Sequence, residues 1–279
     1  MAKKPTILDP ADGLVVSEVG EWASEKHARV QRYIEIASKA RALYVPPPNW
    51  RGGASYIELF SGPGRSLIRD TSRIIDGSPL VAHSAALTSD VPFTAMHLND
   101  SDPAMTAAVD QRLRALGVIP ATYSEPAEIA VDRIIAAINP AGLHFAFLDP
   151  FNLDGLSFEI IKKLARLQRV DMLIHVSVQD LQRNLDDYSR PGDVFDRFAP
   201  GWYDHVDTKQ SINSFRAALM EYWLGEIRKL GTMPAKGVEL IVGSKRQRLY
   251  WLVFVSAHSL AQKLWDAIRD PMKQTTMDF

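Results

Sequence analysis

The chain has 279 residues, of which 46% are hydrophobic and 23% are charged, and its 32 Lys and Arg nearly balance its 33 Asp and Glu. This composition excludes a disordered or fibrous chain, and the net charge of −1 gives no overall attraction to nucleic acid or membranes. Because cysteine is absent, disulfides, thiolate nucleophiles and cysteine-bound metal centres are excluded. The N-terminus is not followed by the apolar run of a signal peptide, and no segment approaches the ~20 apolar residues of a membrane span, so we expect a cytoplasmic protein without membrane or metal.

The first predicted element is a helix from Ser17 to Leu43. Apolar residues recur there at helical spacing, and Ser17 is placed to cap the first turn. The other face is rich in Lys and Arg, which either a solvated surface or a phosphate contact would explain. The prolines at 46–48 stop the helical pattern and predict a stiff linker. We therefore predict an N-terminal helical extension at 1–50, followed by a second domain at 51–279.

Short apolar runs alternate with helical patterns after the linker. The predicted strands lie at 56–60, 93–98, 118–122, 144–148 and 172–178, and the predicted helices at 79–87, 103–116, 127–138 and 157–167. This alternation indicates a parallel sheet with helices on both faces. The runs at 238–242 and 249–255 predict a final antiparallel hairpin, and residues from about 180 to 234 predict an inserted helical and aromatic region. This order favours the Rossmann-like α/β fold of class I methyltransferases that use S-adenosylmethionine (SAM).

Acidic residues and glycines follow the first three predicted strands, at the sheet edge where open parallel sheets bind ligands. Glycines after the first strand let the backbone approach a ligand, and Glu58 can accept from an ammonium group. Asp100 can accept from ribose hydroxyls, while Asp102 or Ser101 caps the next helix. Glu125 lies where adenine would bind, although a plain loop explains it equally well. The candidate cofactor-binding residues are Glu58, Phe60, Ser61, Gly62, Gly64, Asp100, Ser101 and Glu125.

The sequence Asp149-Pro150-Phe151 follows the fourth predicted strand. Proline fixes φ and lacks an N–H, so the Asp149 carboxylate and the neighbouring carbonyl can point in one direction. Such acceptors suit a planar amine, and Phe151 can stack on a base. These three residues are the candidate catalytic residues, with Asn152 as a candidate substrate contact. A purely structural Asp-Pro turn is the alternative.

Residues 65–76 delay the helix that usually follows the glycine turn. Ile68 and Ile74 can pair in a small hairpin over the cofactor, and the arginines of this segment can reach a substrate anion. The candidate substrate-binding arginines are Arg65, Arg69 and Arg73. A structural loop is an equal alternative. The delayed helix is predicted to begin with Ser78 as its cap and Pro79 at its first position.

Other enzyme classes lack their motifs in this chain. Leu67 occupies the place of the third glycine of GxGxxG, and Asp100 lies much further along than the ~20 residues expected of a nicotinamide-binding fold. Neither a GxSxG elbow nor a GxxxxGK[ST] loop is present, which disfavours hydrolases of that kind and P-loop NTPases.

Several segments together resemble the three-Cys-motif partner (TcmP) family: VGEWASEKHARVQRYIEI, YIELFSGPGRS, DGSPLVA, FAFLDPF and RLYWLVFVSAH. The resemblance implies a SAM methyltransferase-like fold and a partner protein that has three cysteines and resembles radical-SAM enzymes. It places Glu58, Gly62 and Gly64 at the methionine end of SAM, Asp100 at the ribose, and residues 149–151 beside the methyl group. Ser61 and Asn152 differ from the alanine and glycine that are common in the family.

These features predict a SAM-dependent methyltransferase that acts on an amine of a nucleobase or nucleic acid. The basic stretch 228–248 would contact phosphates, or would form a solvated hairpin tip. A second interpretation is a non-catalytic methyltransferase-like subunit that works with the three-Cys-motif protein. A third is a nuclease or small-molecule enzyme whose specificity depends on residues 180–234.

Overall fold

The computed structural model describes residues 6–45, 52–190, 192–234, 238–242 and 248–269. Within these residues an eight-stranded sheet has the order β10-β12-β9-β8-β3-β6-β7, with β11 also paired to β12. The predicted linker at 46–48 and the tip of the predicted basic hairpin lie outside the described residues.

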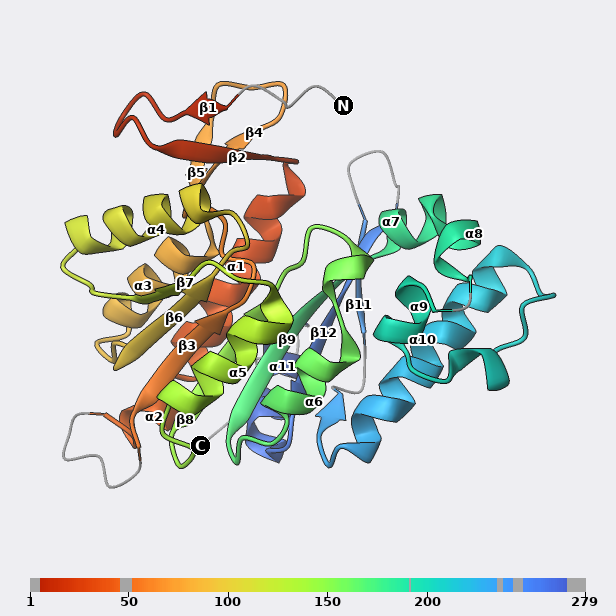
Figure 1. The fold of residues 1–279 in the computed structure, drawn as a ribbon. Helices are drawn as coiled ribbons and strands as arrows, with labels where there is room; N and C mark the ends of the chain where they lie inside the picture. Colours follow the sequence, from red (N-terminus) through yellow and green to blue (C-terminus); the bar gives the residue numbers. More distant parts are fainter. Residues whose placement is uncertain (1–5, 46–51, 191, 235–237, 243–247, 270–279) are drawn as a thin grey trace.

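Five strands of this sheet are parallel (Figure 1). They are β3 (Ala54–Glu58), β6 (Ala95–Asn99), β7 (Ala121–Tyr123), β8 (Leu143–Leu148) and β9 (Val170–Ser177). The chain runs outward from β3 to β7 and returns to β8 on the other side of β3, so the strand order reverses at β3 and β8. Ligands of such sheets bind beyond the carboxyl ends of the strands at this reversal.

The sheet is completed by antiparallel strands, as predicted. β12 (Arg248–Ser256) pairs with β9, and β10 (Met233–Pro234) and β11 (Glu239–Val242) pair with the other side of β12. A parallel sheet with this strand order and an antiparallel β12 confirms the predicted class I SAM methyltransferase-like fold.

Helices cover both faces of the sheet because side chains along each strand alternate between the two sides. One face packs against α1 (Trp22–Ile36), α3 (Ser78–Thr88), α4 (Pro103–Ala115) and α11 (Ser259–Arg269). The opposite face packs against α5 (Ala127–Ala137), α6 (Phe158–Leu164) and α10 (Ile212–Lys229). On β12, Tyr250 and Leu252 belong to the first core and Val253 to the second.

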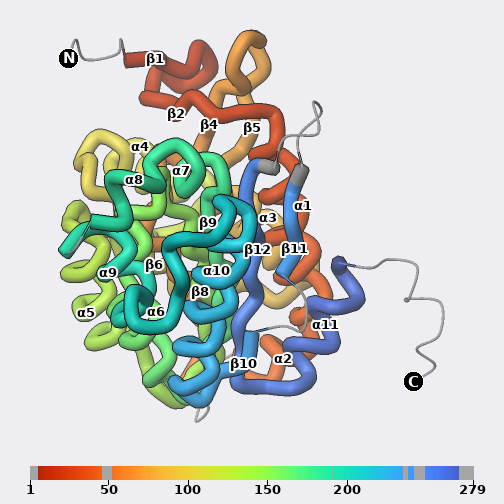
Figure 2. Tube along the Cα trace, turned by 90° about the vertical axis from the view of Figure 1, so that its right-hand side faces the viewer, coloured from red at the N-terminus to blue at the C-terminus, as the bar shows by residue number. Residues whose placement is uncertain are grey.

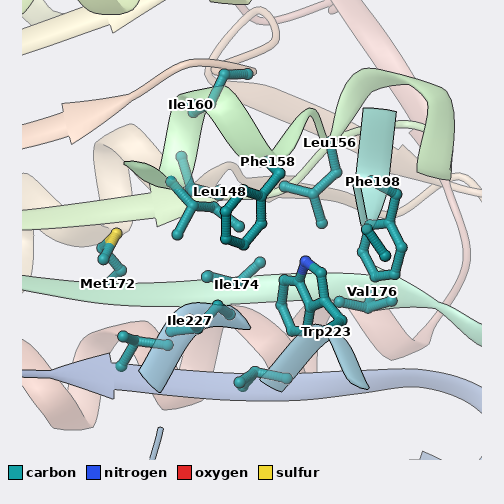
Figure 3. Packing of buried hydrophobic residues seen from close by; sticks show 14 of the residues in the cluster. Leu148, Leu156, Phe158, Ile160, Met172, Ile174, Val176, Phe198, Trp223 and Ile227 are labelled. Carbon is teal, nitrogen blue, oxygen red and sulfur yellow. The ribbon is translucent and has the colours of Figure 1, made fainter. Parts of the chain in front are cut away.

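The region that was predicted as an insertion is helical and contributes to the second core. It contains α7 (Val178–Arg183), α8 (Leu185–Tyr188), α9 (Val194–Phe198), the 3-10 turn η2 (Trp202–Asp204) and α10. Figure 3 shows Trp223 of α10 beside Val176 of β9. Phe198 of α9 stacks on Trp223 with 4.9 Å between the ring centroids. The aromatic residues of this region therefore hold its helices on the sheet.

The start of the predicted N-terminal helix is wrong. Ser17 lies in β2 (Val15–Val19), because Val15, Val16 and Val19 favour an extended chain, and α1 begins only at Trp22. The helix also ends earlier, at Ile36, and a break at Ala37 separates it from α2 (Ser38–Ala42).

A second, four-stranded sheet has the order β1-β2-β4-β5 and lies at one end of the molecule (Figures 1 and 2). It joins β1 (Ile7–Leu8) and β2 to β4 (Arg65–Ile68) and β5 (Ile74–Asp76). The predicted hairpin at 65–76 is therefore present, and Ile68 N donates to Arg73 O at 2.9 Å. Its pairing with the N-terminal strands could not be deduced from local patterns.

The predicted cap of α3 is also wrong. Gly77 occupies the N-cap, and Ser78 is the first helical residue, with its hydroxyl directed to Glu58. The start of α4 agrees with prediction, since Asp102 caps it through a side-chain hydrogen bond. The helix predicted from residue 157 begins one residue later, at Phe158, with Ser157 as its cap.

Candidate functional site

The glycine turn after β3 is held against the end of β6. Gly62 and Gly64 have φ of +56° and +84°, which a residue with a Cβ rarely adopts. A Cβ on Gly64 would lie 3.0 Å from the Val109 side chain of α4. Gly62 N donates to Asp100 Oδ2 at 3.0 Å, and Ser61 N donates to the Asn99 carbonyl at 2.8 Å. The turn therefore has a defined conformation at the carboxyl edge of the sheet, where Gly62 is half-buried and Ser61, Pro63 and Gly64 are buried.

Asn99 connects three strand ends and was missed by the sequence analysis. Its Nδ2 donates to the carbonyls of Leu59 and Glu125, each at 3.0 Å, and its Oδ1 accepts from Glu125 N at 3.1 Å. The ends of β3, β6 and β7 are thus joined by one buried amide. The sequence does contain an indication of this role, because Asn99 is a polar residue at a strand end, next to the predicted ribose contact Asp100.

Asp100 is half-buried and lies between the glycine turn and α4. Its two oxygens accept from Gly62 N and Asp102 N, each at 3.0 Å, and burial raises its pKa. Each carboxylate oxygen has a further lone pair for a hydroxyl donor. Ser101 is exposed next to it, and Phe60 is half-buried. Glu125 forms an ion pair with Arg133 at 2.9 Å. The structure therefore brings these predicted cofactor residues to one edge of the sheet.

Glu58 is fully buried beneath the glycine turn. Its carboxyl group accepts from Ser78 Oγ at 2.5 Å and from Tyr56 OH at 2.7 Å. Burial raises the pKa of Glu58 to about 8, although both hydroxyl donors oppose this shift. Burial therefore favours the protonated form of Glu58 in the folded protein.

The raised pKa of Glu58 predicts a pH-dependent stability. Between its ordinary pKa of 4.5 and its folded value of about 8, the folded protein retains a proton that the unfolded chain releases. The free energy of unfolding should therefore fall as pH rises through this window, by at most ~1.4 kcal/mol per pH unit from this group. Urea denaturation of wild type and Glu58→Gln at several pH values checks this. The variant should show a shallower slope, with exposed Glu159→Gln as control; equal slopes for all three would contradict it.

Asp149 lies at the end of β8, next to β3, and is paired with two buried cationic or titratable side chains. Lys26 of α1 forms an ion pair and hydrogen bond with Oδ2, and His175 Nδ1 of β9 lies 3.2 Å from Oδ1. Burial alone would raise the pKa of Asp149, but Lys26 and His175 outweigh it and lower that pKa. The Asp149 side chain is still 18% exposed, so it can be reached from the carboxyl edge of the sheet.

The next residues point in different directions. Phe151 is 99% exposed, while Pro150 is buried. Asn152 caps the short turn η1 (Leu153–Gly155) by accepting from Gly155 N at 3.2 Å. The Phe151 ring is therefore open to solvent beside a largely buried carboxylate, and its contact with a substrate stays a prediction.

Lys26 and His175 are the site residues that sequence reasoning missed. Lys26 was assigned to the solvated face of the first helix, yet it is only 6% exposed. Its spacing from Ala23 and Val30 is that of the buried stripe, so the helical period contained the signal. His175 lies inside an apolar strand, where nothing in the sequence distinguishes it from a core histidine.

The predicted substrate-binding arginines lie in the small N-terminal sheet and its hairpin. Arg65 pairs with Asp9 at 2.5 Å and with Asp76 at 3.4 Å, and Arg69 pairs with Glu18 at 3.5 Å. Arg73 is exposed at the hairpin end. The first two side chains hold the small sheet together, and contact of any of the three with a substrate stays a prediction.

In the described part of the chain, no group of three or more His, Asp or Glu side chains could hold a metal ion. None of the helices among the described residues is long and apolar enough to cross a membrane.

Comparison with known proteins identifies similar folds but no family. No family model and no curated protein matches the sequence. Among solved structures, protein LPL1258 from Legionella pneumophila (family model DUF519) has a TM-score of 0.51 at 10% identity, with 88% of this chain and 93% of that chain covered. Cofactor-bound Rv0187 from MTB has a TM-score of 0.41 at 14% identity, covering 84% and 89%. M. jannaschii TYW2 in complex with AdoMet has a TM-score of 0.40 at 10% identity, with 90% of this chain and 80% of that chain covered. At these identities, the likeness to LPL1258 shows a shared fold.

Proposed function

We propose that this protein is a SAM-dependent methyltransferase that modifies an amine of a nucleobase or nucleic acid. The observation that carries the proposal is Asp149-Pro150-Phe151 at the strand reversal. There, a largely buried carboxylate lies two residues from an aromatic ring that is 99% exposed. The carboxylate can hold an N–H of the acceptor, and the ring can stack on its base.

The cofactor-facing residues fit SAM. A Cβ on Gly62 would meet only Ser17 Oγ within 4 Å, at 3.6 Å, so there is space beside Gly62 for a ligand. In the proposal Gly62 and Gly64 lie at the methionine end, Asp100 accepts from the ribose hydroxyls and Glu125 lies near the adenine. Phe60, Ser61 and Ser101 line the same edge. SAM supplies an electrophilic methyl group, which is why the protein needs mainly to align the acceptor and exclude water.

The acceptor amine is held by Asp149 in this proposal. A carboxylate that accepts an N–H directs the nitrogen lone pair toward the methyl group while Phe151 fixes the plane of the base. Pro150 adds no competing N–H donor. A base inside a duplex would have to be flipped out to reach this position. Asn152 lies beside Phe151 and would contact the same substrate.

The resemblance to the TcmP family supports a second element of the proposal, a three-Cys-motif partner protein. A methyltransferase-like subunit that binds this partner without turnover is the alternative within the same family. The ionised Asp149 and the structured glycine turn favour turnover, because a subunit without catalysis has no need of a buried carboxylate with an open approach.

The proposal is tested by transfer of tritium from methyl-labelled SAM to bulk tRNA and ribosomal RNA. Asp149→Asn should lower transfer by about 100-fold or more, because the amide no longer offers two equivalent acceptor oxygens to the amine. Asp154→Asn, a change of the exposed acid in η1, is the matched control and should retain activity. Transfer that is equal in wild type and Asp149→Asn would contradict the role of Asp149.

A further inference from the structure

A polar cluster lies directly beneath Asp149 and has no role in the proposal so far. It consists of Lys26 from α1, His175 from β9 and Tyr250 from β12, three elements that are distant in the sequence. The rings of His175 and Tyr250 have centroids 4.5 Å apart, and Lys26 Nζ lies 5.8 Å from the centre of the Tyr250 ring. Lys26, His175 and Tyr250 are 6%, 8% and 1% exposed. A cluster that is so buried needs a physical reason for its polar atoms.

The neutral ring of His175 has one N–H donor, but two hydrogen-bond acceptors lie near it. Asp149 Oδ1 lies 3.2 Å from Nδ1, and the backbone of Pro150, which can only accept, also interacts with the ring. A neutral imidazole has one N–H for these two acceptors. Among the described residues Nδ1 forms no aligned hydrogen bond, although Asp149 Oδ1 lies 3.2 Å from it. A protonated ring would carry a donor on each nitrogen and so could serve both acceptors.

Burial and Lys26 keep the ring neutral. Burial is the larger cause, the charge of Lys26 is the second, and together they lower the pKa of His175 to about 4 against the opposing effect of Asp149. The titratable and charged groups that face this position from the surrounding elements are Lys26 and His27 of α1, Glu58 of β3, Asp149 after β8 and Tyr250 of β12. Arg29 and Glu25 of α1 and Glu239 of β11 act on Tyr250. Among the described residues, the positive charge that acts directly on His175 is that of Lys26.

We propose that His175 receives, through Asp149, the proton that the acceptor amine loses during methyl transfer. This inference rests on the proposed function. The nitrogen lone pair forms the bond to the methyl carbon, and the carbon–sulfur bond breaks with its electron pair going to sulfur. An N–H bond then breaks, and its proton passes to Asp149 and on to His175 Nδ1. The products are the methylated amine, the thioether and an imidazolium that has its second donor.

A weakly basic acceptor is suited to this step. The lone pair of an exocyclic base amine is delocalised into the ring, so the nitrogen becomes a strong acid as the methyl group attaches. A histidine that is unprotonated throughout the neutral pH range can therefore accept a proton in every turnover. An ordinary histidine would already be partly protonated near pH 6.5. Lys26 has a defined part in this arrangement, because its charge adds to the effect of burial in keeping His175 unprotonated before turnover.

The first test is an NMR titration of the histidine ring signals of the free protein, with His175 assigned through His175→Gln. In wild type the His175 signal should stay that of a neutral ring down to about pH 5. Lys26→Met should raise its pKa by at least about one unit, a tenfold gain in proton affinity, while Lys26→Arg should leave it low. The inference is overturned if wild-type His175 titrates near its ordinary pKa. It is also overturned if Lys26→Met leaves the pKa of His175 unchanged.

The second test uses the pH profile of tritium transfer to bulk RNA. Lys26→Met should shift the acid limb of the profile to higher pH, and His175→Gln should remove that limb and slow transfer with SAM affinity unchanged. His144→Gln, which changes another buried neutral histidine in the neighbouring strand, is the matched control. An identical profile in wild type and His175→Gln overturns the proton-acceptor role alone. Absence of SAM binding instead overturns the proposed function. In that case the NMR titration still measures the coupling of His175 to Lys26.

Discussion

Replacing Arg112 with alanine should lower the free energy of unfolding by about 3 kcal/mol, because one buried acceptor left without its donor costs about 1–3 kcal/mol and Arg112 serves several acceptors. Arg112 of α4 is only 6% exposed. Its guanidinium donates to both carboxylate oxygens of Asp12, at 2.8 and 2.9 Å, and to the carbonyls of Val15 and Pro63, at 2.9 and 2.7 Å. It also lies 3.8 Å from Asp9, which is 1% exposed. Alanine would leave these acceptors without their donor.

The same change should loosen the glycine turn, because Arg112 connects the N-terminal strands to Pro63 within that turn. Urea denaturation measures the loss of stability, and Arg112→Lys should recover only part of it, since lysine cannot bind four acceptors in one plane. Arg114→Ala removes an exposed arginine two residues further along the same helix and should change stability little. Equal effects of the Arg112 and Arg114 changes would show that the buried network does not stabilise the fold.

Removing either partner of the Lys26–Asp149 pair should be nearly as costly. Lys26→Met leaves a carboxylate without its lysine, and Asp149→Asn leaves a buried ammonium group without an anion, so we expect a loss of about 3 kcal/mol in each case. The double variant removes both charges and should lose at least about 1 kcal/mol less than the sum of the single variants. This difference measures the coupling of the two side chains.

The double-mutant cycle is measured by urea denaturation near neutral pH. Lys163 and Asp132 form an exposed pair at 2.8 Å between α6 and α5, and the same cycle there is the control, with little coupling expected. Additive losses at Lys26 and Asp149 would contradict a direct interaction between them. The result would then remove the basis for the effect of Lys26 on His175.

The central sheet could be predicted because its strands are short apolar runs with glycines, acids or prolines at their ends. This periodicity places Asp100 and Asp149 at the same edge of the sheet, and the structure puts both there. Phe151 follows Asp149-Pro150 in the sequence and is exposed in the structure, while its role as a substrate contact stays a prediction. Local patterns are sufficient for such positions because the carboxyl ends of parallel strands meet at one edge.

The missed features all depend on contacts between distant segments. Lys26 reaches Asp149 across 123 positions, and Arg112 reaches Asp12 across 100. A lysine on a helix is normally solvated, so only the packing of α1 onto the sheet shows that Lys26 is buried. The small N-terminal sheet was missed because β2 pairs in parallel with β4, which requires a long connection that no turn signal marks. Ser78 was taken for a cap because serine is common there, but its hydroxyl binds Glu58 instead.

The central claim, a SAM site at the carboxyl edge of the sheet, is tested most directly by calorimetric titration with SAM, S-adenosylhomocysteine and NAD. We predict micromolar binding of the first two ligands and no binding of NAD. Asp100→Ala should weaken SAM binding by about tenfold, as expected for lost hydrogen bonds to a charged group, without unfolding the protein. Exposed Asp132→Asn should leave binding unchanged. Binding of none of the three ligands by the folded wild-type protein would contradict the account.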